Sequence, residues 1–305
     1  MSRAVLAAFR EAVRRYGARP DVTGISISIK ERRGALVPSE GPVIAIHVVR
    51  KRSVAKVKAK RIPRQVLGVP TDVVEGAYES EGGGGLAVAA SPPTLTPGAS
   101  IARADGSAAS FGVVVVNAAG KPFVLCAGHT LREGGKGKKG DAIVHPGPAD
   151  AAPSARRLVA RYERVHFGLD AGLARLEAGV SASNTLPGGR YVMAASDPVL
   201  GEVLEKHGRT TGTTQAIVQG LGIFRNVYPA LHLRPLAGDM DDRPLSDRGD
   251  SGAVWYGAES GSAKGLHSQG SGAAPIGGEY GVAGVLTSIL ATFKVAVATG
   301  TVTGV

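Results

Sequence analysis

The sequence contains one cysteine, Cys126, so the chain cannot form an internal disulfide. Aromatic residues make up only 5% of its 305 positions, and no stretch approaches the roughly 20 consecutive apolar residues that a membrane-spanning helix needs. Residues 1–20 contain several arginines and lack the continuous apolar core of a secretory signal. We therefore expect a cytoplasmic chain with no membrane span and no disulfide framework.

Turn-forming residues are abundant, with 44 glycines and 18 prolines. From residue 111 onward, short apolar stretches alternate with turn signals, which is typical of an all-β fold rather than of long helices. A chain of this length can bury a sizeable core in one large or two modest domains.

Positive charge predominates, with a formal net charge of +11. Between positions 50 and 64 there is no acidic residue, and eight basic ones are present: Arg50, Lys51, Arg52, Lys56, Lys58, Lys60, Arg61 and Arg64. Such a run can neutralise phosphates, but no aromatic residues alternate with it to stack on bases. Nucleic acid is therefore a less favoured partner. The positive charge is explained equally well by an acidic protein partner or an acidic substrate.

Three segments differ in composition. In residues 1–80, an amphipathic pattern over 4–16 predicts a helix, and apolar stretches near 25–29, 43–49 and 71–74 predict strands, so we expect a small basic α+β accessory domain. Residues 81–110 are rich in glycine and proline, which predicts a linker. The rest of the chain, 111–305, is expected to form the second domain.

The tetrapeptide Gly249-Asp250-Ser251-Gly252 is the feature around which the second domain is organised. Glycines on both sides of a serine let the backbone turn tightly, which frees the hydroxyl and brings neighbouring amide N–H groups toward one point. A nucleophilic serine and its oxyanion hole need this geometry. The same residue types also form ordinary polar turns, so the motif needs support from elsewhere in the chain.

Two upstream segments supply a candidate base and a candidate acid. His129 follows the apolar run 123–126 and two small residues, and Asp170 stands immediately before the apolar run 171–174. His129 precedes Asp170 by 41 residues, and Asp170 precedes Ser251 by 81. Asp150 and Asp197 compete for the role of the acid, but neither opens an apolar strand as cleanly. Cys126 is expected to be a small buried residue rather than a thiol nucleophile.

With these segments in the order His, Asp, Ser, the sequence resembles the trypsin-like serine peptidases of the chymotrypsin fold. The resemblance covers residues 105–292 and implies two six-stranded antiparallel β-barrels, here preceded by the α+β domain. Residues 1–80 also look like the short N-terminal domain of some bacterial members.

The family's catalytic roles then fall on particular residues of this chain. Ser251 would be the nucleophile, His129 the group that carries its proton, and Asp170 the group that orients the imidazole. The backbone N–H groups of Gly249 and Ser251 match the family's oxyanion-hole positions.

Asp250 needs a cationic partner if it is buried, because an unpaired buried carboxylate is costly. In many family members this acid pairs with an amino terminus released by activation cleavage. No activation site is evident in the sequence before the first expected barrel strand at Phe111. We therefore predict that an internal cation such as Arg248 or Arg243 compensates Asp250.

The resemblance also places a set of substrate-binding residues: Leu245, His267, Ser268 and Gly270. Leu245 stands where the family has the base of its primary pocket, and a leucine there argues against cleavage after Lys or Arg. Residues 264–270 look like the strand that lines this pocket and pairs with extended substrate. His267 is similar to the pocket histidine of bacterial glutamate-specific peptidases, which favours acidic or small apolar residues before the cut bond. A His267 that faces the core is an equally good interpretation.

We therefore expect a serine endopeptidase that acts on protein or peptide substrates without a cofactor or a metal ion. The alternative is a catalytically silent chymotrypsin-fold module that docks acidic partners or nucleic acid through its basic N-terminal region.

Overall fold

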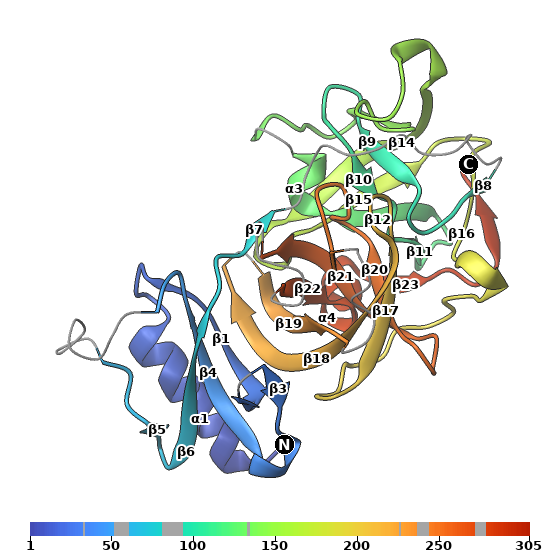
Figure 1. Ribbon diagram of the computed structural model, residues 1–305. Helices are drawn as coiled ribbons and strands as arrows, with labels where there is room; N and C mark the ends of the chain where they lie inside the picture. The colour runs from blue at the N-terminus through green and yellow to red at the C-terminus, as the bar shows by residue number, and fades with distance from the viewer. Residues whose placement is uncertain are drawn as a thin grey trace.

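The computed structural model describes residues 1–32, 34–51, 61–80, 94–132, 135–225, 227–236, 244–271 and 279–305. Two curled β-sheets form most of the molecule, and a helix-covered unit at the N-terminus lies against one of them (Figure 1). The middle of the basic run, 52–60, lies outside the described residues, as do 81–93 of the expected linker and Arg243. None of the helices in the described part of the chain combines the length and hydropathy needed to cross a bilayer.

The N-terminal unit contains the expected helix and strands. Helix α1 (Arg3–Tyr16) is capped by the Ser2 hydroxyl, which accepts a hydrogen bond from the Val5 amide at 3.3 Å. One face of α1 packs on β1 (Val22–Ile29) and β4 (Pro42–Val48). The remaining strands of the unit are β6 (Val69–Glu75), which runs parallel to β4, with β5 (Gln65–Val66) beside it and a hairpin of β2 (Glu31–Arg32) and β3 (Ala35–Leu36).

The strand expected around 25–29 has one apolar and one polar face, yet every residue of β1 is buried. Ser26 and Ser28, on the polar face, hydrogen-bond each other at 2.7 Å, and Ser26 also bonds Nε2 of His47 at 2.9 Å. Because these hydroxyls have partners inside the protein, they can be buried at low cost.

The second sheet closes on itself. Its strands are β17 (Val203–Gly208), β18 (Gly212–Phe224), β19 (Val227–Pro235), β20 (Val254–Gly257), β21 (Ala263–Gly270) and β22 (Gly281–Val285). They follow the order β17-β20-β21-β22-β19-β18, and pairing of β17 with β18 completes a six-stranded antiparallel barrel. One of the two predicted barrels is therefore confirmed as a closed barrel.

The first sheet is curled but its path of strands stays open. It has eight strands in the order β10-β9-β13-β14-β15-β12-β11-β23. Their bounds are β9 (Ser100–Arg103), β10 (Ala109–Ser110), β11 (Val113–Asn117), β12 (Pro122–Ala127), β13 (Ala142–His145), β14 (Arg157–His166), β15 (Ala171–Leu176) and β23 (Val295–Val297). Beside it lies a small sheet of β8 (Thr94–Leu95), β16 (Ser181–Ser183) and β24 (Thr301–Thr303).

Part of the segment expected as a linker is built into these sheets. β8, β9 and β10 all lie within 94–110, and β9 pairs with β13 while β8 pairs with β16. Ile101 is buried in a cluster with Phe111 and Val124. The glycine and proline content that suggested a linker marks the turns between these short strands.

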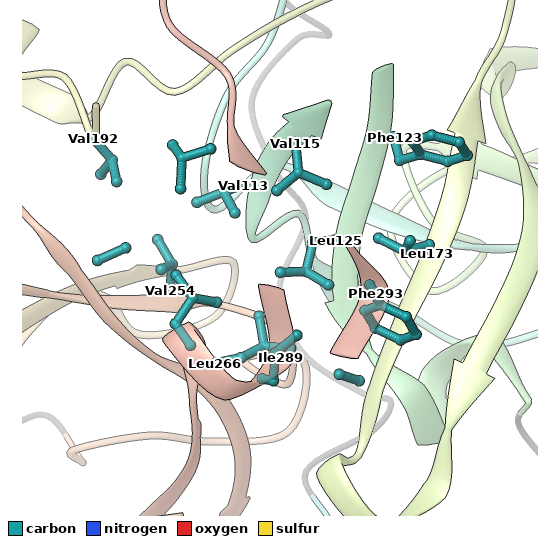
Figure 2. Close-up of a cluster of buried hydrophobic side chains, with 14 of the residues drawn as sticks. Val113, Val115, Phe123, Leu125, Leu173, Val192, Val254, Leu266, Ile289 and Phe293 are labelled. Atoms are coloured by element: carbon teal, nitrogen blue, oxygen red, sulfur yellow. The ribbon is translucent and has the colours of Figure 1, made fainter. Parts of the chain in front are cut away.

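One large cluster of buried apolar side chains lies where the two sheets face each other. Val113 and Leu125 from the first sheet meet Val254 and Leu266 from the second, and helix α4 (Leu286–Phe293) contributes Ile289 (Figure 2). Segments far apart in the chain are thereby held together at the edge where the candidate catalytic residues lie.

Strand pairing joins the N-terminal unit to the closed barrel. β18 is 13 residues long, and its second half pairs with β1 from Gly24 opposite Phe224 to Ser28 opposite Gly220. A Cβ on Gly222 would lie 2.0 Å from the Ile25 carbonyl oxygen, so only glycine allows the two strands this close at that point.

Candidate active site

His129 and Asp170 meet at the end of the first sheet. Helix α3 (Gly128–Leu131) follows β12 directly, and Asp170 immediately precedes β15 with φ at 43°, a conformation that aspartate tolerates better than most residues. The Asp170 carboxylate accepts a hydrogen bond from the His129 amide at 2.8 Å and from Nδ1 of its imidazole at 2.7 Å. With Nδ1 donating, the neutral ring presents Nε2 as an acceptor.

The Ser251 hydroxyl lies close to this pair but does not bond the imidazole. It donates to the Ser268 carbonyl at 3.5 Å, and the Ser268 hydroxyl in turn donates to Asp170. Nε2 of His129 is buried, and no described residue is its hydrogen-bond partner. Ser268 thus contacts both the candidate nucleophile and the candidate acid.

Backbone geometry in the serine loop requires both glycines. Gly249 has φ at 103° and Gly252 at 93°, and a Cβ on Gly252 would lie 2.5 Å from the Ser110 carbonyl oxygen. Ser110, which the sequence did not single out, donates from its amide to the Ser251 carbonyl and from its hydroxyl to the Gly249 carbonyl, both at 2.9 Å. The carbonyl groups of the loop are therefore bonded, and the Gly249 and Ser251 amides have no acceptor among the described residues.

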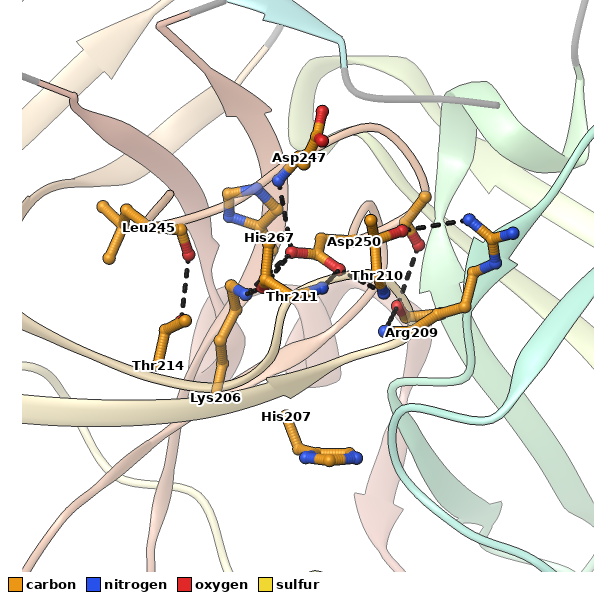
Figure 3. Close-up of polar contacts among 12 residues, drawn as sticks. Lys206, His207, Arg209, Thr210, Thr211, Thr214, Leu245, Asp247, Asp250 and His267 are labelled. Carbon is orange, nitrogen blue, oxygen red and sulfur yellow. Dashed lines mark hydrogen bonds and ion pairs between the residues drawn. The ribbon is translucent and has the colours of Figure 1, made fainter. Parts of the chain in front are cut away.

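Asp250 is enclosed by a polar network (Figure 3). Its carboxylate forms an ion pair with Lys206 at 2.9 Å and accepts hydrogen bonds from the Thr211 hydroxyl at 2.5 Å and from the Thr210 amide at 2.9 Å. Burial alone would raise the pKa of Asp250, but the Lys206 ammonium and the Thr211 hydroxyl outweigh it and hold the pKa at about 2.

The internal cation predicted for Asp250 is present, but it is Lys206 and not Arg248. Arg248 contributes its carbonyl oxygen, which accepts a hydrogen bond from the Thr210 hydroxyl at 2.7 Å. Lys206 lies on β17, far from the serine loop in sequence, and β17 pairs with β20, which follows that loop. Only the closure of the barrel brings the ammonium to Asp250.

The other candidates for the catalytic acid and the nucleophile have different surroundings. Asp150 forms a buried ion pair with Arg209, with Nε donating to Oδ2 at 2.6 Å. Asp197 accepts a hydrogen bond from the Thr287 hydroxyl at 2.5 Å. Cys126 is fully buried, and burial raises the pKa of its thiol to about 12, so it is not a thiolate at neutral pH.

Two residues expected in the substrate pocket are buried inside the closed barrel. Leu245 belongs to an apolar cluster with Leu233 and Trp255, and its carbonyl accepts a hydrogen bond from Thr214 at 2.9 Å. His267 is fully buried, and its Nδ1 accepts a hydrogen bond from Trp255 at 3.2 Å. Nδ1 therefore acts as an acceptor, which leaves Nε2 as the donor atom of the ring.

Ser268 and Gly270 lie on β21, as expected. A two-residue strand, β7 (Glu79–Ser80), pairs antiparallel with this end of β21. Ser80 also borders a cavity of about 580 Å³ whose lining includes His129, Asp170 and Gln269. In the part of the chain that the structure describes, no group of three or more His, Cys, Asp or Glu side chains is arranged to hold a metal ion.

These sheets and the order of the site residues along them define the chymotrypsin fold, the fold of a large class of bacterial serine proteases. One solved structure similar to this chain is a glutamic-acid-specific serine protease that uses a histidine triad in substrate binding, with 22% identity, 67% of this chain and 100% of that chain covered, and a TM-score of 0.53. Another is protease A of Thermobifida fusca, with 16% identity, 68% and 100% covered, and a TM-score of 0.50. No family model and no curated protein matches the sequence.

Proposed function

We propose that this chain is a serine endopeptidase in which Ser251, His129 and Asp170 carry out the reaction. The observation that carries the proposal is the imidazole of His129, which Asp170 fixes at 2.7 Å through Nδ1 and whose buried Nε2 is left without a partner in the described structure. An imidazole held in this way is ready to accept a proton. The bond from Ser251 to the Ser268 carbonyl is long at 3.5 Å, so rotation of the hydroxyl toward Nε2 costs little.

The reaction follows from these positions. The Ser251 oxygen attacks the substrate carbonyl carbon while Nε2 of His129 takes the hydroxyl proton. His129 then gives that proton to the leaving amine, and a water molecule repeats the sequence on the acyl-enzyme ester. Asp170 stabilises the imidazolium while it exists.

We assign to the amides of Gly249 and Ser251 the role of donating hydrogen bonds to the developing oxyanion. Their lack of acceptors among the described residues supports this role, because donors already bonded to protein would be unavailable to the substrate. Loss of one such donor costs roughly 3 kcal/mol of barrier in comparable sites.

For specificity we propose a preference for acidic or small apolar residues before the cut bond. Support comes from Leu245, an uncharged residue where a basic side chain would need an acid. One of the similar structures is that of a glutamic-acid-specific protease. In this chain the ring of His267 contacts Trp255.

The test is labelling with a fluorophosphonate, followed by digestion of a peptide library. We expect the wild-type chain to be labelled, Ser251→Ala to be unlabelled, and Ser260→Ala, on an exposed turn, to behave as the wild type. A folded wild-type chain that neither takes the label nor cuts any peptide would favour the catalytically silent binding module. Cleavage mainly after Lys or Arg would contradict the proposed specificity.

A further inference from the structure

The peptide group that joins Arg248 to Gly249 determines where one of the proposed oxyanion-hole donors points. In a trans peptide the carbonyl and the N–H point in opposite directions, so the position of the Arg248 carbonyl fixes the direction of the Gly249 N–H. That carbonyl accepts a hydrogen bond from the Thr210 hydroxyl at 2.7 Å. Among the described residues, the Thr210 hydroxyl is the only hydrogen-bond partner of this peptide group.

The two peptide groups on either side of Asp250 are held by backbone bonds. The Asp250 amide donates to the Asp247 carbonyl at 3.0 Å. The Asp250 carbonyl accepts from the Ala253 amide at 2.9 Å, and this bond fixes the direction of the Ser251 N–H. The second proposed donor is therefore oriented by the turn itself, without a side chain.

Gly249 leaves both directions of its own N–H open. Its φ is 103°, and a half-turn of the peptide group would make φ negative, a region that glycine populates about as readily. A Cβ on Gly249 would lie 2.6 Å from the Thr210 hydroxyl oxygen, so only glycine lets the loop approach that hydroxyl this closely. The direction of the Gly249 N–H thus depends on the bond from Thr210 and not on a backbone preference.

The Thr210 hydroxyl is itself oriented by a buried ion pair. The Arg209 side chain lies beside Thr210 (Figure 3), and its Nη1 donates to the Thr210 hydroxyl at 3.0 Å. A guanidinium can only donate, so the hydroxyl accepts this bond and directs its own proton to the Arg248 carbonyl. Arg209 is held in turn by Asp150, and both side chains of this pair are fully buried.

We propose that Thr210 is a positioning residue whose hydroxyl keeps the Gly249 N–H directed at the substrate oxygen. Arg209 sets the direction of that hydroxyl. A hydrogen bond to the carbonyl also polarises the peptide group, which makes its N–H a stronger donor. This inference rests on the proposed function, because it concerns the oxyanion formed in that reaction.

The expected consequence is a loss of rate without a loss of substrate binding. Thr210 acts through a peptide group whose bond to the substrate strengthens as the oxyanion develops, so its removal should lower kcat and leave KM nearly unchanged. Complete loss of one oxyanion-hole donor costs roughly 100- to 1,000-fold in kcat. A donor that is still present but no longer held in one direction should cost less, about 10- to 100-fold.

The experiment compares full-length variants in the steady-state hydrolysis of one peptide that the wild-type chain cuts. Thr210→Val removes the hydroxyl at nearly constant volume and should lower kcat, whereas Thr210→Ser keeps the hydroxyl and should recover most of the activity. The matched control is Thr213→Val. Its exposed hydroxyl bonds Nδ1 of His207 at 2.9 Å and contacts no part of the serine loop, so kcat should be unchanged.

Urea unfolding of each variant shows whether the fold is intact. If valine disturbs the fold, Thr210→Ala is the second variant, and the same loss in kcat is expected. A folded variant without the hydroxyl that keeps the wild-type kcat, an equal loss in Thr210→Ser or Thr213→Val, or an effect on KM alone would overturn this inference and leave the proposed function standing. A wild-type chain that neither takes a fluorophosphonate label nor cuts any peptide would overturn both.

Discussion

The site contains two buried carboxylates, Asp170 and Asp250, and they differ in their partners. Asp170 faces an imidazole, bonded to Nδ1 at 2.7 Å, whereas Asp250 faces the Lys206 ammonium at 2.9 Å. The ammonium group serves as a charge partner, while the imidazole is the group that carries the proton in the proposed reaction. Asp250 therefore maintains the shape of the serine loop, and Asp170 supports a group that changes charge during the proposed reaction.

Because the two acids have different roles, we expect their substitution to change different measured quantities. Substitution of Asp170 should lower the catalytic rate and leave the stability of the fold unchanged. Loss of the ion pair between Asp250 and Lys206 should lower the free energy of unfolding. A third buried polar cluster, around His47 and His232, has no carboxylate partner among the described residues and should respond to pH instead.

The largest effect is expected for Asp170→Asn. The amide can still occupy the same space, but it favours the wrong tautomer of His129, so kcat should fall by about four orders of magnitude. The measurement is steady-state hydrolysis of a peptide with glutamate before the cut bond, together with urea unfolding as the control. A variant with near wild-type kcat would show that Asp170 does not orient the base.

Next in size is Lys206→Met, which leaves the Asp250 carboxylate buried without its cation. We expect a loss of about 3–5 kcal/mol in the free energy of unfolding, measured by urea denaturation. The matched control is Lys121→Met, where the lysine is exposed on the turn between β11 and β12. Adding Asp250→Asn to Lys206→Met should recover part of the loss, and an unchanged midpoint in the single variant would contradict this account.

Smaller, when counted per pH unit, is the loss of stability in mild acid at the junction of the two units. Burial lowers the pKa of His47 to about 3 and that of His232 well below its usual value. Both rings are thus neutral in the folded chain but bind protons near pH 6.5 when exposed, so their stabilising effect is complete above pH 6.5 and is lost as the pH falls below it. Each should cost about 1.4 kcal/mol per pH unit in that range.

Hydrogen exchange of the β1 and β18 amides at pH 7 and pH 5 measures this directly, after correction for intrinsic exchange rates. Asp250, with a pKa of about 2, does not titrate in this interval. Protection factors that stay constant between the two pH values would show that the two histidines are not kept neutral by burial.

Local sequence patterns predicted much of the secondary structure and the candidate catalytic residues. The amphipathic repeat in 4–16 predicted α1, and short motifs identified His129, Asp170 and Ser251, which the fold brings to one end of the two sheets. The closed barrel followed from the family resemblance, but the open path of the first sheet did not. The roles proposed for the triad and for Leu245, His267, Ser268 and Gly270 remain predictions.

Those local patterns could not predict contacts between segments that are distant in the sequence. Lys206 meets Asp250 only through the pairing of β17 with β20, and nothing in either local sequence indicates it. The pairing of β1 with β18 depends on glycines such as Gly222, whose spacing has no periodic signature. β7 is two residues long, too short for any alternation of polar and apolar side chains to reveal it.

The pairing of β7 with β21 also sets a threshold for peptides arriving from solution. A strand that is tethered to the same molecule competes at an effective concentration of about a millimolar, and this competition persists for as long as β1 remains paired with β18. Under the proposed function, peptides that bind weakly would therefore be excluded for as long as β7 is paired with β21.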